Sequence, residues 1–162
     1  MNQQPEIQVT YTILNHQGFA DVMINNLTGE KSLHSLQQFK KDAIVCEFSA
    51  GVISSIPTYL TVQIGIEKHI TLSPEFLQYC NHSCNPNVFF DTTNYELIAL
   101  KNIEIGEELT FFYPSSEWDM TQSFACTCNN KNCLHNIKGA KYLAKEILPN
   151  YRFTDFINSM LK

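Results

Sequence analysis

The stretch that decides the fold of this chain is a polar run between two apolar segments. It reads Tyr79-Cys80-Asn81-His82-Ser83-Cys84-Asn85-Pro86-Asn87. After the tyrosine every residue is polar, cysteine or proline, so the run is poor material for a hydrophobic core. Its many hydrogen-bonding groups suit a buried loop that contacts a polar ligand, although a surface turn has a similar composition.

The pair of His82 and Cys84 in this run admits a second interpretation, as a thiol nucleophile and its base. Residues two apart rarely orient correctly for this chemistry, because triad partners usually come from distant positions. A nucleophilic cysteine is therefore the less favoured interpretation.

A cluster of three cysteines, Cys126, Cys128 and Cys133, lies in an asparagine-rich segment with C-x-C-x4-C spacing. Three thiolates this close together can converge on one zinc ion, which prefers four tetrahedral ligands. The residues leave two candidates for the fourth ligand, His135 and Cys84.

Composition narrows the class of protein. The chain has 162 residues, 44% of them hydrophobic, and a net charge of −5, which predicts one globular domain and disfavours direct nucleic-acid binding. No apolar run approaches the roughly 20 residues of a membrane helix, and the first residues do not resemble a secretory signal. We therefore expect an intracellular protein, cytoplasmic or nuclear, in which clustered cysteines hold metal rather than form disulfides. Cys46 and Cys80 are expected to be small buried residues.

Short bursts of apolar and β-branched residues predict strands, so we expect an α+β, mainly β domain. The expected strands cover 9–14, 20–24, 43–48, 60–66, 88–90, 95–100 and 109–112, and short helices are expected at 32–39, 74–79 and 140–147. Turn-forming residues at 91–94 predict a hairpin. Near the end, Phe153, Phe156, Ile157, Met160 and Leu161 repeat at helical spacing. They predict an amphipathic helix that packs on the same chain, with an oligomer contact as the alternative.

A third motif completes the pattern: Gly106-Glu107-Glu108-Leu109-Thr110-Phe111-Phe112-Tyr113. Together the three motifs resemble the SET-domain family of S-adenosylmethionine-dependent protein lysine methyltransferases. They match its N-H-S-C-x-P-N signature, its E-E-L-T-x-x-Y signature and its cysteine-rich post-SET tail. The resemblance implies a β-clip fold of several short-stranded sheets, with a knot-like crossing near the C-terminal motifs. It divides the chain into a SET domain at 9–115, a post-SET zinc-binding segment at 116–143 and a C-terminal helix at 144–162.

The resemblance also implies the site residues. Cys84 would join the three clustered cysteines around one structural zinc ion, and Tyr113 would be the catalytic tyrosine beside the methyl donor. The residues implied to contact S-adenosylmethionine are Gly18, Phe19, Asn81, His82, Tyr113, Phe124 and Leu134.

For the substrate channel the resemblance implies Phe111 and Phe112. Phe111 occupies the position that tunes the number of methyl groups, and phenylalanine there predicts more than monomethylation. The chain departs from the family where Phe48 replaces a tyrosine, and Tyr79 is the candidate to supply that hydroxyl to the channel. The implied substrate is a lysine-containing protein. A small-molecule amine as acceptor, or a non-catalytic SET-like zinc-containing binding module, are the alternatives.

Overall fold

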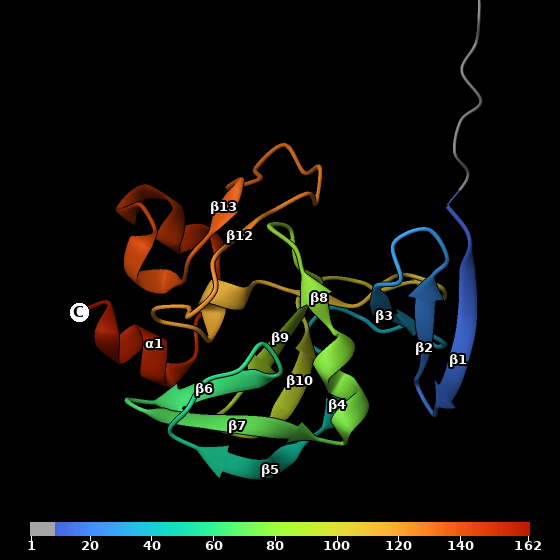
Figure 1. Cartoon of the computed structure of the whole chain (residues 1–162), viewed down its shortest axis with the longest axis horizontal. Helices are drawn as coiled ribbons and strands as arrows, with labels where there is room; N and C mark the ends of the chain where they lie inside the picture. The colour runs from blue at the N-terminus through green and yellow to red at the C-terminus, as the bar shows by residue number, and fades with distance from the viewer. Residues whose placement is uncertain (1–8) are drawn as a thin grey trace, which may run out of the picture.

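The computed structural model describes residues 9–162 and is built from many short strands (Figure 1). The strands are β1 (Tyr11–Gln17), β2 (Ala20–Asn25), β3 (Lys31–Ser35), β4 (Ile44–Glu47), β5 (Ser49–Ser54), β6 (Thr61–Gly65), β7 (Lys68–Ser73), β8 (Asn81–His82), β9 (Val88–Asp91), β10 (Glu96–Ala99), β11 (Thr110–Phe111), β12 (Phe124–Ala125) and β13 (Asn136–Ile137). The helices are 3₁₀ turns at Glu75–Tyr79, Tyr113–Ser115, Ala140–Tyr142 and Lys145–Asn150, and α1 (Asp155–Met160). This confirms the expected α+β, mainly β class.

Three sheets of three strands make up most of the fold, in the orders β1-β2-β3, β4-β10-β9 and β5-β7-β6. Figure 1 shows the β1-β2-β3 sheet at one side of the molecule and α1 at the other, with β8, β9 and β10 between them. The predicted β9–β10 hairpin is confirmed. Its turn is fixed by the Asp91 carboxylate, which accepts the backbone N–H groups of Thr93 and Asn94.

The two signature motifs are joined at a short parallel pair of strands, β8 and β11, in which Asn81 lies opposite Thr110. Asn87, only 2% exposed, fastens the same two segments with its side chain. Its amide Nδ2 donates to the Glu107 carboxylate and the Glu108 carbonyl, and its Oδ1 accepts from the Thr110 N–H at 2.8 Å. The polar run is therefore a hydrogen-bonded connector inside the fold, because its amides replace the ladder that longer strands would provide.

Two hydrophobic clusters hold these elements together. The larger lies among the sheets and includes Leu33, Val45, Leu72, Val88, Phe90, Leu97 and Phe111. The smaller lies beneath the C-terminal segment and contains Phe112, Ala140, Phe153 and Ile157.

Several helices expected from the sequence are strands or tighter turns. Residues 31–35 form β3 because β2 offers a pairing edge that opposes Leu33 to Val22. Residues 140–142 and 145–150 are 3₁₀ turns, the latter with Pro149 inside it, and proline opposes a regular α-helix. The helix expected within 144–162 is only α1, which is capped by the Thr154 hydroxyl accepting the Ile157 N–H. No helix in residues 9–162 has the length and apolar character needed to cross a bilayer.

Candidate active site

The four cysteines of the implied zinc site lie together. The Sγ atoms of Cys84, Cys126, Cys128 and Cys133 are all within 4.8 Å of one another, and those of Cys84 and Cys126 are 3.9 Å apart. Four thiolates at the usual Zn–S bond length of about 2.3 Å sit about 3.8 Å from each other in a tetrahedron. The cluster therefore has the size and donor set for one tetrahedral metal ion.

The positions of the ligand atoms distinguish the two candidates for the fourth ligand. The Leu134 N–H donates to Cys84 Sγ and the His135 N–H to Cys133 Sγ, each at 3.4 Å, so His135 supports the cluster through its backbone. The side chain of His135 is outside the group of metal-competent residues, whereas Cys84 is in it. Although burial raises the pKa of the Cys128 thiol, hydrogen bonds from Asn130, Cys84 and Cys126 outweigh it and bring that pKa to about 6, which favours the thiolate. Burial raises the pKa of the Cys84 and Cys126 thiols, so without a metal ion the cluster shares its protons unequally.

His82 connects the cysteine cluster to Tyr113. Its Nδ1 accepts the Tyr113 backbone N–H at 3.2 Å, so the ring proton is on Nε2, which donates to Cys84 Sγ at 3.4 Å. Burial lowers the pKa of His82 to about 4, which keeps the ring neutral. The histidine is therefore a structural bridge, and the thiol–base interpretation of His82 and Cys84 loses its support because Nε2, the nitrogen that faces Cys84, already carries the ring proton and cannot accept one from the thiol.

Three aromatic rings surround this bridge, those of Phe112, Tyr113 and Phe124, whose centroids lie 5.7, 5.2 and 5.6 Å from that of His82. The Tyr113 centroid also lies 4.6 Å from that of Phe111 and 5.7 Å from that of Phe124. Burial raises the pKa of the Tyr113 hydroxyl above its usual range, with the charge of Glu108 and Glu117 adding to the effect, so this group stays protonated.

Phe111 and Tyr113 line a cavity of about 520 Å³, here called the tyrosine cavity. Residues 57–62 form one wall, residues 119–124 the opposite wall, and the turn at 75–79 contributes Leu77 and Gln78. Its charged lining residues are Glu117 and Asp119, with no lysine, arginine or histidine among the described residues that line it. The cavity is therefore apolar near Tyr113, and its ionisable acidic groups have no basic counterpart in the described lining.

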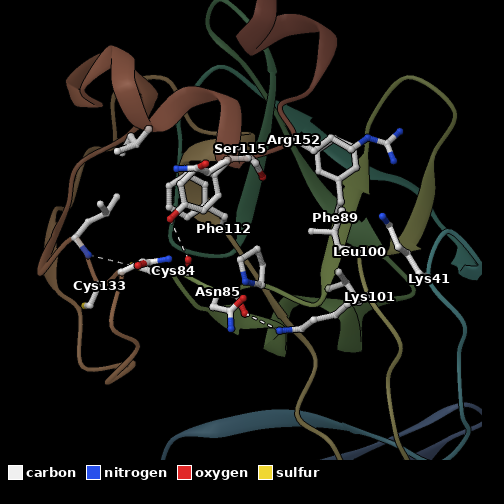
Figure 2. Close-up of a pocket in the computed structure, with 17 residues that line it drawn as sticks. Lys41, Cys84, Asn85, Phe89, Leu100, Lys101, Phe112, Ser115, Cys133 and Arg152 are labelled. Carbon is white, nitrogen blue, oxygen red and sulfur yellow. Dashed lines mark hydrogen bonds between the residues drawn. The ribbon is translucent and has the colours of Figure 1, made fainter.

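Phe112 points to the other side of the chain. Its ring stacks on that of Tyr151, with centroids 3.8 Å apart and planes 8° from parallel, and the Tyr151 hydroxyl donates to the Cys84 carbonyl at 2.9 Å. Phe112 lines a second cavity of about 650 Å³, here called the C-terminal cavity, shown in Figure 2. The structure therefore separates Phe112 from the expected channel, because the backbone at this residue is extended and successive side chains alternate.

The charged residues of the C-terminal cavity are all basic: Lys41, Lys101 and Arg152. Figure 2 shows Arg152 against Phe89, and the guanidinium carbon is 4.4 Å from that ring centroid. The Lys101 ammonium donates to the Asn85 carbonyl at 3.2 Å.

Asn81, one of the residues implied to contact the methyl donor, lies beside Lys31. Asn81 Nδ2 donates to the Lys31 carbonyl at 2.8 Å and to Glu108 Oε1 at 3.1 Å. The Lys31 ammonium lies 3.4 Å from the Tyr79 hydroxyl, so Tyr79 faces Lys31 and is outside the tyrosine cavity. Lys31 is a neighbour that sequence reasoning missed, because no local pattern marks a contact across 50 positions.

Gly18 and Phe19 form the β1–β2 turn, where Gly18 has a φ of +64°. The Phe19 ring packs against Phe39 and Phe76, with centroids 6.4 and 5.7 Å away. Asn81 forms side-chain hydrogen bonds with Lys31 and Glu108, and none with Gly18 or Phe19. Leu134 is partly buried in the smaller hydrophobic cluster and lines the C-terminal cavity, next to the cysteines.

The family model described as SET domain matches residues 30–114 of the 162. The match leaves out Gly18 and Phe19 before it, and Phe124, Leu134 and the three clustered cysteines after it. The methyltransferase flvH of Aspergillus flavus is 36% identical over 132 residues, which are 80% of this chain and 74% of that protein.

The H3 lysine-36 specific histone-lysine N-methyltransferase of Debaryomyces hansenii is 34% identical over 70 residues, which are 40% of this chain and 9% of the relative. Among solved structures, the methyltransferase domain of human histone-lysine N-methyltransferase SETMAR has the same fold, with a TM-score of 0.51 and 18% identity, covering 82% of this chain and 59% of that one. These relatives support a methyltransferase activity. The chain belongs to the SET domain family.

Proposed function

We propose that this protein is an S-adenosylmethionine-dependent methyltransferase that transfers methyl groups to the side-chain amine of lysine in a protein. One observation carries the proposal: the Tyr113 hydroxyl and the Phe111 ring line a cavity that has acidic but no basic residues in its described lining. Aromatic faces and negative charge favour a cationic amine, and burial favours its neutral, nucleophilic form.

The methyl donor supplies an electrophilic methyl group on a sulfonium centre. The residues proposed to hold it are Asn81, the backbone of His82, Phe124 and Leu134. Both ring nitrogens of His82 are engaged within the chain, so its side chain is not free to bind the donor. The neutral imidazole and the rings of Tyr113 and Phe124 fit a positively charged sulfonium because they attract it without a competing cation.

The roles of the chain's own groups follow from their positions. The walls of the tyrosine cavity would confine the alkyl stem of the amine and so limit the orientations of its nitrogen. The protonated Tyr113 hydroxyl is proposed to orient the amine's lone pair by a hydrogen bond. The Tyr113 backbone is held by His82, which prevents the hydroxyl from drifting.

The four-cysteine cluster is proposed to hold one zinc ion. The ion would join the central loop to the tail that carries Phe124 and Leu134, and thereby support the donor side of the site. A four-thiolate site also suits a reducing compartment, in accord with an intracellular location.

The proposed acceptor, lysine in a protein, is supported by the names of relatives. Several relatives are named histone-lysine N-methyltransferases, which favours a protein acceptor. The flvH protein, whose match spans 80% of this chain, is named only a methyltransferase. The tyrosine cavity is also large enough for a free amine, so a small-molecule amine is the second candidate. A non-catalytic binding module is less favoured because Tyr113 sits in a formed cavity.

The experiment begins with calorimetry of the protein with S-adenosylmethionine and with its demethylated product. Methyl-label transfer is then measured to a lysine-rich protein mixture and, separately, to free lysine and n-butylamine. Donor binding with label on protein lysines supports the main proposal. Label only on the free amines supports the second candidate, and absence of donor binding at millimolar concentration rejects both.

A further inference from the structure

The tyrosine cavity contains one carboxylate whose position is fixed by the backbone, that of Glu117. Its Oε1 accepts the Gln63 backbone N–H at 2.9 Å, and the Glu117 N–H donates to the Tyr113 carbonyl at 3.0 Å. The Gln63 side chain completes the clamp, because its Oε1 accepts the Trp118 N–H at 2.9 Å. Glu117 is therefore held across β6 and the turn that starts at Tyr113.

The charge of Glu117 is not balanced by a cation within the described chain. Salt bridges between residues 9 and 162 do not include it, whereas Asp119, the other acid of the cavity, bonds the Lys141 ammonium at 2.8 Å and the Tyr142 hydroxyl at 3.0 Å. Burial raises the pKa of Glu117 to about 8, although the Gln63 N–H opposes that shift. A partly buried carboxylate beside a catalytic tyrosine, without its own cation, is an arrangement that functional sites use to bind a charged ligand.

We propose that Glu117 binds the substrate amine as its ammonium ion and accepts one proton from it. This rests on the proposed function, since it assigns the proton acceptor of that same reaction. It requires no group beyond those in the cavity, because the carboxylate and the ammonium exchange a single proton.

In the proton transfer, one N–H bond of the ammonium breaks and one O–H bond forms on Glu117, which turns a charged pair into a neutral amine and a neutral carboxylic acid. The nitrogen lone pair released in this step is the one that bonds the transferred methyl carbon. The positive charge that the donor brings ends on the methylated product, and the proton on Glu117 returns to solvent when the product leaves. A base with a pKa near 8 is well matched to this role at physiological pH.

The direct test uses the metal-loaded protein without any methyl donor. Glutamate is labelled with ¹³C at the carboxyl carbon, and the carboxyl resonances are followed by NMR from pH 5 to 10. We expect one resonance with a midpoint near pH 8 that disappears in Glu117→Gln. Addition of n-butylamine should move that midpoint to lower pH, because the bound ammonium stabilises the carboxylate.

Glu117→Gln keeps an oxygen that can accept the Gln63 N–H, so the clamp is preserved while the charge is lost. Binding of n-butylamine, measured by calorimetry at pH 8, should be about tenfold weaker in this variant. Glu146→Gln, an exposed site on the C-terminal 3₁₀ turn, makes the same change in net charge and should bind like the wild type. Equal amine affinity for Glu117→Gln and wild type, or the same titration in both, would overturn the inference.

Kinetics separate this inference from the proposed function. If Glu117→Gln loses amine binding but the wild type transfers no methyl group, the amine site stands and the methyltransferase proposal fails. If both proteins transfer methyl groups with the same dependence of kcat/KM on pH, the function stands and the role of Glu117 is rejected. The expected result is an inflection near pH 8 in the wild type that is absent from the variant.

Discussion

The two cavities lie on opposite sides of three consecutive residues, Phe111, Phe112 and Tyr113, and differ in charge. The tyrosine cavity has two acids and no base among its described lining residues, whereas the C-terminal cavity has three bases and no acid among its own. The first side faces residues 57–62 and the second faces the end of the chain.

This difference shows that residues 111–113 contribute to the tyrosine cavity with one face and to hydrophobic packing with the other. Phe111 and Tyr113 project into the cavity where a cation is expected, and Phe112 projects into the smaller hydrophobic cluster and stacks on Tyr151. The stack is linked to the metal cluster through the Cys84 carbonyl, so the packing side supports the chemical side. Substitutions in this segment should therefore separate stability from activity.

Metal loss should have the largest effect, because both cavities use the tail that the cysteines anchor. In Cys128→Ser, or after strong chelation, we expect loss of one zinc per chain and loss of hydrogen-exchange protection over residues 119–135, with β1–β3 unchanged. Metal analysis and hydrogen exchange measure these changes. Cys46→Ser is the matched control, since Cys46 is outside the cluster and this variant should keep its zinc. Wild-type protein prepared without chelators and still free of metal would contradict the four-cysteine assignment.

Tyr113→Phe should have the next largest effect, and only on the tyrosine-cavity side. We expect methyl transfer to fall by at least about 100-fold because the hydroxyl that orients the amine is lost. The midpoint of thermal unfolding should change little, since the ring keeps its contacts with Phe111 and Phe124. Tyr11→Phe, at an exposed tyrosine outside both cavities, should retain full activity. Retained activity in Tyr113→Phe would remove this residue from the reaction.

Phe112→Ala should affect stability rather than product. The side chain is 2% exposed and stacked, so its removal is expected to lower the free energy of unfolding by about 3–5 kcal/mol. Denaturant unfolding measures the loss, and the more conservative Phe112→Leu should retain enough fold for assay. A Phe112→Leu variant that is fully stable but makes a different methylation product would place Phe112 in the channel after all.

The motifs made the metal cluster predictable, because ligand type and close spacing limit how three of its cysteines can be used. The hairpin at Asp91 was also predictable from local turn chemistry. The opposite orientation of the Phe112 side chain was also predictable, because successive side chains of an extended backbone point to opposite faces.

Contacts between distant residues were not predictable. Lys31 meets Asn81 across 50 positions, and Gln63 holds Glu117 across 54. No local pattern marks such pairs, because they arise from the packing of different sheets. The type of the short helices was not predictable for a related reason: local residues indicate where a helical turn forms, but tertiary packing decides whether it is a 3₁₀ or an α-helical turn.

Phe111→Tyr should have the smallest effect on stability and the most specific effect on product. The ring of Phe111 lies 4.6 Å from that of Tyr113, so a hydroxyl added to it occupies space next to the amine and narrows the room for methyl groups. We expect the wild type to form dimethylated or trimethylated lysine, and the variant to stop at the monomethyl product with about the same rate for the first methyl group. Mass spectrometry of the product over time measures this. Because Phe112 faces the other cavity, Phe112→Tyr should leave the product distribution unchanged. A wild type that forms only monomethyl-lysine would contradict the prediction and show that the tyrosine cavity is narrower at Phe111 than its volume indicates.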